Sequence, residues 1–238
     1  MPETKFRKIN NLIGWLLFLV ALVTYGLTVE PTASYWDAGE YISTSAKLQV
    51  GHPPGAPFFQ MMGAVFSMFA SNNESIAIAV NFLSVVSSAF VILFLFWSTT
   101  LFLKKISKKN NFTNDTNILL SSSIGALAFT FSDSFWFNAV ETEVYALAML
   151  FLSATLWCGL RWEKDFDNKR GDKWLLLICF LIGLSFGVHF MAILTIPAIG
   201  MIYFFKKYEK ITIKNFVLAN IISVSILLFI FKLLLPFT

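Results

Sequence analysis

Six carboxylates and both histidines of this chain fall in three polar segments that separate long apolar runs. The segments read EPTASYWDAGEYISTSAKLQVGHPPGAPFF, then SDSFWFNAVETEVYAL, then GLSFGVHFMA. A carboxylate can act as a general base, and an imidazole can bind or carry a proton. Ionisable groups at membrane depth are costly, so they point to a functional site by default. Their concentration in three segments is the strongest internal sign of a site.

Each of these residues also has a purely structural interpretation. Asp37 can cap a helix that begins at Ala38, with Glu40 at its third position, as in a capping box. The run from His52 to Gly55, HPPG, can be a rigid turn, because proline fixes φ and glycine frees it. Three further residues can be solvated loop acids or a packing histidine: Glu141, Glu143 and His189.

The composition is that of a membrane protein. Of the 238 residues, 57% are hydrophobic and 13% are charged, with a mean hydropathy of +0.70, whereas about 25% of the residues in a soluble domain are charged. Cys158 and Cys179 both lie in apolar runs, so we expect two buried thiols rather than a disulfide. The absence of a CxxC motif or a His/Cys cluster argues against a structural zinc site.

A membrane-spanning helix needs roughly 20 apolar residues. The first apolar run follows a basic cluster and lacks a small-residue cleavage site, so we interpret it as an uncleaved span rather than a signal peptide. The apolar runs are Asn11–Val29, Ile76–Leu103, Ile118–Phe131, Phe135–Trp162, Trp174–Phe205 and Ile211–Pro236.

Membrane topology, rather than nucleic-acid binding, accounts for the excess of positive charge. Only Lys47 and Lys232 lie outside four basic clusters, which the positive-inside rule places in the cytoplasm. An even number of crossings must then separate consecutive clusters, which predicts seven spans with turns near Ser132–Ser134 and Gly187–Phe190. The clusters are Lys5, Arg7, Lys8; Lys104, Lys105, Lys108, Lys109; Arg161, Lys164, Lys169, Arg170, Lys173; and Lys206, Lys207, Lys210, Lys214.

The run Trp174–Phe205 is too short for two full crossings. Its 32 residues reach about 48 Å as a helix, whereas two crossings need about 60 Å. We therefore expect its outer turn to stop short of the surface and to line a cavity open to the outer side. A single long tilted helix is the alternative. The first outer loop covers residues 30–75, and Pro57–Ala70 is expected to form an amphipathic helix along the interface.

Three motifs together resemble glycosyltransferase family 117, a bacterial membrane family of the GT-C superfamily that is related to eukaryotic transmembrane protein O-mannosyltransferases. They are WDAGEYISTSAKLQVGHPPGAPFF, FWFNAVETEVYAL and GLSFGVHFMAIL. The resemblance runs over nearly the whole chain. The first motif, Asp-x-Gly-Glu followed by His-Pro-Pro-Gly, is the specific one, and the other two support it.

The resemblance implies an all-α, multi-span helical bundle of GT-C type, with residues 1–238 forming one transmembrane domain and a long first extracytoplasmic loop. Such enzymes carry an essential acid near the end of the first span, and the matching residue here is Asp37, with Glu40 beside it. We expect both to be catalytic. The expected substrate-binding residues are Lys47, His52, Glu141, Glu143, Tyr145 and His189.

The predicted function is transfer of a sugar, such as mannose, from a polyprenyl-phosphate carrier to a Ser or Thr hydroxyl of an extracytoplasmic protein. Asp37 would act as general base in an inverting reaction at the periplasmic face of a bacterial inner membrane. The leaving phosphate needs positive charge, supplied by a divalent cation held by the acids or by an Arg or Lys from elsewhere. Relatives continue beyond this length, so a missing C-terminal region or a partner subunit is expected. A lipid-linked-substrate transporter and a non-catalytic membrane subunit remain alternatives.

Overall fold

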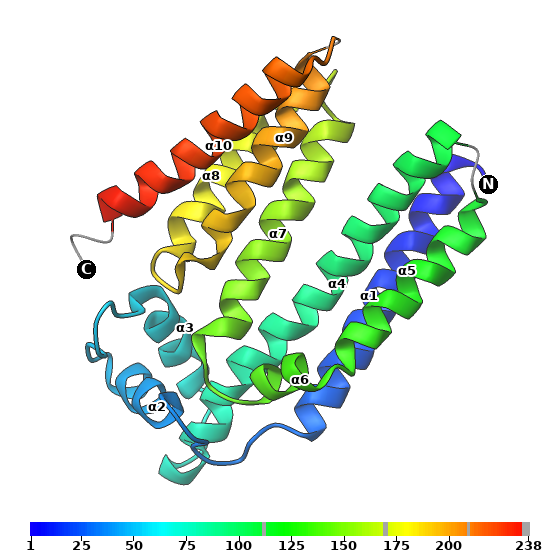
Figure 1. Ribbon diagram of the computed structural model, residues 1–238. Helices are drawn as coiled ribbons and strands as arrows, with labels where there is room; N and C mark the ends of the chain where they lie inside the picture. Colours follow the sequence, from blue (N-terminus) through cyan, green and yellow to red (C-terminus); the bar gives the residue numbers. More distant parts are fainter. Residues whose placement is uncertain (111–112, 169–170, 209, 235–238) are drawn as a thin grey trace.

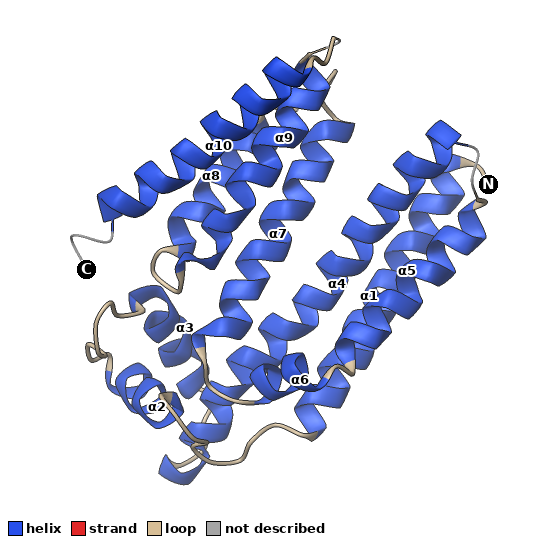
Figure 2. Ribbon diagram, in the orientation of Figure 1, coloured by secondary structure: helices blue, strands red, loops and turns tan. Residues whose placement is uncertain are grey.

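The computed structural model describes residues 1–110, 113–168, 171–208 and 210–234, and all regular secondary structure in these ranges is helical (Figures 1 and 2). The predicted all-helical architecture is confirmed. The helices are α1 (Glu3–Leu27), α2 (Ala38–Lys47), α3 (Pro57–Ser67), η1 (Asn73–Ser75), α4 (Ile76–Asn110), α5 (Asp115–Thr130), α6 (Asp133–Val140), α7 (Val144–Lys164), α8 (Lys173–Ser185), η2 (Phe190–Leu194), α9 (Thr195–Lys207) and α10 (Ile213–Leu234).

The long helices form two groups that are joined where α4 packs against α7. Helices α1, α4 and α5 lie side by side in one group, and α7 to α10 form the other (Figure 1). The short helices α2, α3 and α6 gather at one end of the bundle, which we call the acidic end (Figure 1). The N-terminus, the C-terminus of α4 and the α7–α8 and α9–α10 connections lie at the opposite end, which we call the basic end (Figure 1).

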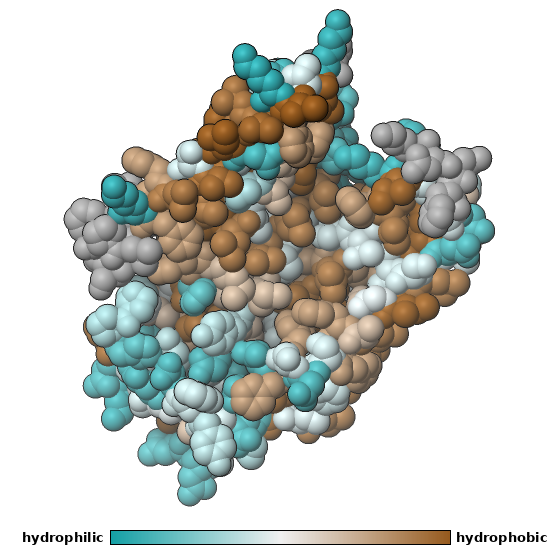
Figure 3. Space-filling model, in the orientation of Figure 1, coloured by the Kyte–Doolittle hydropathy of each residue, from teal (hydrophilic) through white to brown (hydrophobic). Residues whose placement is uncertain are grey.

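Several helices are long and apolar enough to cross a membrane. Among the described residues, five helices qualify by length and hydropathy, and a sixth is counted if α5 and α6, which are bent by 64°, form one broken span. Helix α8 has 13 residues, which is about 20 Å and too short to cross alone, so the seven-span prediction is not confirmed. Hydrophobic residues cover the middle of the visible face, and hydrophilic ones gather over α2 and α3 and at the opposite tips (Figure 3).

Two predicted apolar runs are divided. The run Phe135–Trp162 was expected to be continuous, but α6 ends at Val140 and α7 starts only at Val144. The reason is that Glu141 and Glu143 adopt extended backbone, where the carbonyl of Val140 accepts a hydrogen bond from the N–H of Glu30 in the loop that follows α1. The run Trp174–Phe205 reverses between Ser185 and Phe190, as predicted, so the alternative of a single long helix is wrong.

Three other sequence predictions have different outcomes in the structure. Both cysteines are free, but only Cys158 is buried, whereas Cys179 is exposed on α8. The prediction of two buried thiols is wrong for Cys179, because apolar sequence in a bundle of this kind covers the outer surface as well as the core. The interfacial segment is indeed helical, as α3, although its position at an interface stays a prediction. Parts of two basic clusters and the end of the last run fall outside the described residues or side chains: Lys109, Lys169, Arg170 and Pro236.

Close packing holds α2 and α3 together at the acidic end. A side chain at Gly63 would place its Cβ 2.5 Å from Oγ of Ser45, so only glycine permits this approach. The buried amide of Gln60 donates to Oγ1 of Thr44 at 3.1 Å. Beneath them, Phe59 packs in an apolar cluster with residues of α4 and α7, including Leu83 and Val144. The first polar segment is therefore a folded platform rather than a loose loop.

Candidate active site

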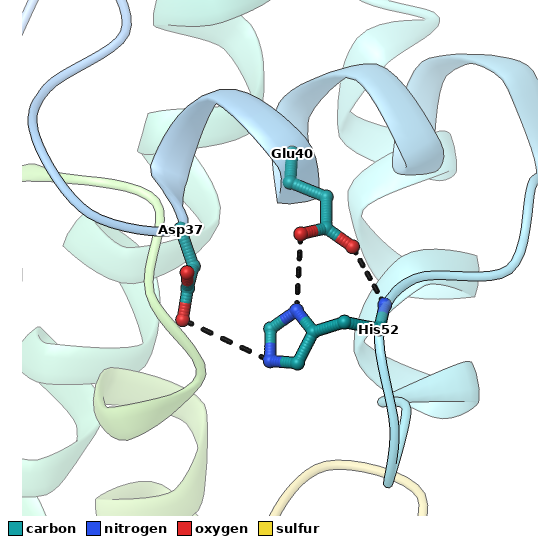
Figure 4. A group of neighbouring side chains, drawn as sticks. All are labelled: Asp37, Glu40 and His52. Atoms are coloured by element: carbon teal, nitrogen blue, oxygen red, sulfur yellow. Dashed lines mark hydrogen bonds and ion pairs between the residues drawn. The ribbon is translucent and has the colours of Figure 1, made fainter.

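Three side chains of the first polar segment converge beside the N-terminus of α2 (Figure 4). Nδ1 of His52 lies 3.0 Å from Oε2 of Glu40, and the backbone N–H of His52 donates to Oε1 of Glu40 at 2.6 Å. Nε2 of His52 lies 3.9 Å from Oδ2 of Asp37. The carboxylate of Glu40 therefore orients the imidazole, whose other nitrogen faces Asp37.

Asp37 does not have the capping role that the sequence also allowed. It is the residue before α2, but its side chain makes no capping hydrogen bond, and its backbone is already helical (φ −85°, ψ −2°). Glu40 bonds to His52 rather than back to the cap, so the capping-box interpretation is wrong. The Asp37 carboxylate is half exposed and is paired only loosely with His52. It is thus available to a ligand.

A cavity of about 470 Å³ opens between the first polar segment, the α6–α7 loop and the α8–η2 turn. It joins all three motifs that the sequence singled out, with lining residues that run from Asp37 to Phe190 along the chain. Its wall mixes acids, two imidazoles and aromatic rings, which is a surface able to hold a polar ligand. Five predicted site residues line it: Asp37, His52, Glu143, Tyr145 and His189.

Glu143 is the most strongly perturbed acid in the cavity. Its side chain is 7% exposed. Burial, followed by repulsion from the carboxylates of Asp37 and Glu141, raises the pKa of Glu143 to about 7. At neutral pH this group is therefore divided between its acid and its carboxylate form, so it can donate as well as accept a hydrogen bond.

The two histidines are tuned in opposite directions. The hydrogen bond and charge of Glu40 raise the pKa of His52, so its imidazolium form is favoured. Burial lowers the pKa of His189, whose ring lies against Tyr145 with centroids 5.6 Å apart. The protonated form is therefore more favoured in His52 than in His189.

The α8–η2 turn is held against the start of α3 by backbone contacts. The carbonyl of Gly187 accepts hydrogen bonds from the N–H groups of Phe58 at 2.7 Å and Phe59 at 3.1 Å. A Cβ at Gly187 would lie 2.6 Å from the Cβ of Phe58, well inside ordinary contact. This glycine lets the turn that carries His189 approach the first polar segment.

Three of the predicted site residues do not line the cavity. Glu40 is not part of the lining, but its carboxylate contacts the imidazole of His52, which is. Glu141 is buried at one side, where burial raises its pKa. Lys47 is exposed at the far end of α2. The described lining of the cavity therefore contains no lysine or arginine.

Asn81, which was not among the predicted site residues, connects two of the three polar segments. Asn81 is 1% exposed within α4, and its Nδ2 donates to the carbonyls of Glu30 at 2.6 Å and Thr32 at 3.0 Å. Its Oδ1 accepts from Oγ1 of Thr142, between Glu141 and Glu143. The sequence did contain a sign of this role, a single amide inside the apolar run from Ile76. A polar side chain at membrane depth needs hydrogen-bond partners within the protein.

One group of described residues could hold a metal ion. The ligand atoms of Asp37, Glu40 and His52 all lie within 4.8 Å of one another. Oxygen and imidazole donors of this kind suit a divalent cation such as Mn²⁺ or Zn²⁺. The direct bonds between Glu40 and His52 serve equally well to hold an imidazolium without metal.

The fold and the site together define a class: an all-helical protein of membrane-spanning type with a carboxylate–imidazole cavity at one end of the bundle. A family model described as the N-terminal domain of protein O-mannosyl-transferase TMEM260 matches residues 37–212, beginning at Asp37. The chain belongs to this family, which confirms the predicted relation to the protein O-mannosyltransferases.

Two curated relatives carry the same name. Protein O-mannosyl-transferase tmem260 of Dictyostelium discoideum is 26% identical over 91% of this chain and 27% of its own length. Protein O-mannosyl-transferase TMEM260 of Mus musculus is 26% identical over 71% of this chain and 22% of its own length. The chain thus spans about a quarter of the length of these relatives. No solved structure matches it significantly.

Proposed function

We propose that this chain forms the active-site part of a membrane glycosyltransferase of GT-C type, within glycosyltransferase family 117. It transfers a sugar, such as mannose, from a polyprenyl-phosphate carrier to a Ser or Thr hydroxyl of a protein. The observation that carries the proposal is the half-exposed carboxylate of Asp37 at the edge of a cavity that all three polar motifs line. The names of the two relatives support the choice of mannose and of a protein acceptor.

Asp37 acts as the general base in this proposal. The acceptor oxygen attacks the anomeric carbon of the sugar, and its proton passes to the Asp37 carboxylate. The bond between the anomeric carbon and the phosphate oxygen breaks, and the phosphate leaves with the electron pair on the opposite face, which inverts the configuration. A positioned base contributes about 10²–10⁴-fold, and holding the two substrates together contributes much of the remainder.

The phosphate needs positive charge or hydrogen-bond donors. In the described lining these come from His52, whose pKa is raised by Glu40, and from the acid form of Glu143. A divalent cation at Asp37, Glu40 and His52 would be a further source, as would a basic residue outside this chain. Tyr145 and His189 also line the cavity, with their rings in contact, and offer an aromatic surface for the sugar ring.

The site is proposed to face the outside of the membrane, with the basic end in the cytoplasm as the positive-inside rule requires. A multi-pass protein of a bacterial inner membrane, with seven spans, fits this arrangement. Lysines and arginines of the described N-terminus and α9–α10 connection lie at the basic end, opposite the cavity (Figure 1).

The experiment compares two sugar donors with the purified chain in lipid nanodiscs. Radiolabelled polyprenyl-phosphate mannose and a nucleotide-linked mannose are each offered with a Ser/Thr-rich acceptor peptide. The proposal expects label in the peptide from the lipid-linked donor alone. Transfer from the nucleotide-linked donor would contradict the proposed donor class. In sealed proteoliposomes, lipid-linked donor that crosses the bilayer without transfer would indicate a transporter.

A further inference from the structure

A second cavity, of about 480 Å³, lies at the basic end of the bundle, far from the candidate active site. Helices α1, α4, α7 and α9 all contribute to its wall. Five lysines and two glutamates line it, which leaves an excess of three positive charges. Apolar side chains of Leu101, Phe102 and Leu160 complete the wall. The cavity is therefore amphiphilic, with cations and a hydrophobic surface within one hollow.

One carboxylate connects the two helix groups inside this basic cavity. Oε2 of Glu3 lies 2.8 Å from Nζ of Lys104 on α4, and Oε1 lies 3.2 Å from Nζ of Lys164 on α7. The side chains of Lys104 and Lys164 are 28% and 49% exposed, so an incoming anion can reach both ammonium groups. Two other lysines are paired as well, Lys105 with Glu163 and Lys206 with Asp167.

We propose that the basic cavity binds the phosphate of an anionic phospholipid. A phosphate diester carries a negative charge that the excess lysines attract, and the acyl chains of the lipid can cover Leu101, Phe102 and Leu160. Basic pockets between membrane helices suit lipid head groups in this way. The apolar wall favours a lipid over free phosphate, which would leave that surface in water. In this arrangement the Glu3 carboxylate pairs with Lys104 and Lys164 until the lipid phosphate replaces it.

The sign of the Glu3 effect separates this proposal from a structural role. If Glu3 merely stabilised the bundle, Glu3→Gln would not improve lipid binding. If Glu3 competes with a lipid phosphate for Lys104 and Lys164, Glu3→Gln should increase the affinity about fivefold. Lys104→Ala combined with Lys164→Ala should decrease it about 30-fold, which corresponds to about 1 kcal/mol for each lysine.

Native mass spectrometry of the full chain in neutral detergent tests this proposal with phosphatidylglycerol and phosphatidylcholine of identical acyl chains as probes. We expect preferential binding of phosphatidylglycerol, weakened by the double lysine variant, strengthened by Glu3→Gln and unchanged by Lys214→Ala. Lys214 is exposed at the start of α10, outside the cavity, and is the matched control. Each variant is first checked for an unchanged size-exclusion profile and thermal midpoint.

Three results would overturn the proposal. The two lipids could bind equally, or Lys214→Ala could weaken binding as much as the double variant, which would indicate general surface charge. Alternatively, inorganic phosphate at about 10 mM could displace the bound lipid completely, which would show a simple anion site. None of these measurements depends on sugar transfer, so this proposal and the proposed function are tested independently.

Discussion

Replacing Gly187 by alanine tests whether the α8–η2 turn and the first polar segment form one site. The new Cβ would meet the Cβ of Phe58 at 2.6 Å and its backbone nitrogen at 3.1 Å. Carbon atoms in ordinary contact are about 3.5–4.0 Å apart, so the turn and α3 must separate by about 1 Å.

That separation removes two backbone hydrogen bonds. The N–H groups of Phe58 and Phe59 lie 2.7 and 3.1 Å from the carbonyl oxygen of Gly187, and a shift of about 1 Å takes both beyond the usual limit of about 3.2 Å. Each bond contributes about 0.5–1.5 kcal/mol, and overpacking adds about 1–3 kcal/mol. We expect Gly187→Ala to lower the free energy of unfolding by about 2–6 kcal/mol and to weaken substrate binding, because the same turn carries His189.

The assay is thermal unfolding in detergent followed by tryptophan fluorescence, together with KM in the sugar-transfer assay. The matched control is Gly183→Ala on α8, where a Cβ would meet nothing within 4 Å and alanine favours the helix. The control should be unchanged or slightly more stable. If Gly187→Ala unfolds at the same temperature as the control, the turn does not contact α3 and the three-motif cavity is not formed as described.

Three further predictions concern the polar groups around the cavity. Asn81→Leu should lower stability by about 2–4 kcal/mol, since it removes three hydrogen bonds and leaves Thr142 unpaired; an unchanged thermal midpoint would refute the connecting role. The pKa of Glu143 is raised from 4.5 to about 7, so ionising it costs stability progressively as the pH rises from 4.5 to 7. Glu143→Gln should therefore stabilise the protein by about 1–3 kcal/mol at pH 8 and not at pH 4.5, and an equal effect at both values would contradict it. Glu40→Gln should return the raised pKa of His52 towards its ordinary value of 6.5, as followed by NMR titration of the imidazole, and an unshifted titration would show that Glu40 does not control it.

Much of the architecture could be predicted from apolar runs and charge. The runs separated by lysines predict helices, and the short run from Trp174 predicts the reversal near Gly187 that the structure contains. The break at Glu141–Glu143 was harder to foresee, because the apolar residues on both sides read as one span. The break depends on contacts with the distant segment after α1, such as the hydrogen bond from the N–H of Glu30 to the carbonyl of Val140 at 2.9 Å.

The candidate site, like the fold, could be predicted only in part from the sequence. Residue type and the family motif were sufficient to select Asp37, His52, Glu143 and His189, which the structure brings to one cavity. The pairing of Glu40 with His52 is set by the path of the chain through the HPPG turn, twelve residues later. Asn81 was missed because its role arises from the meeting of two loops, which no local pattern records.

The central claim is that Asp37 removes the proton from the acceptor hydroxyl. The most direct test is the single-turnover rate of sugar transfer by Asp37→Asn, with both substrates saturating and with thermal unfolding confirming that the variant is folded. Because asparagine keeps the shape but cannot accept the proton, we predict a rate about 10²–10⁴-fold below that of the unaltered chain. A variant that binds both substrates and transfers sugar at an undiminished rate would show that another group is the base.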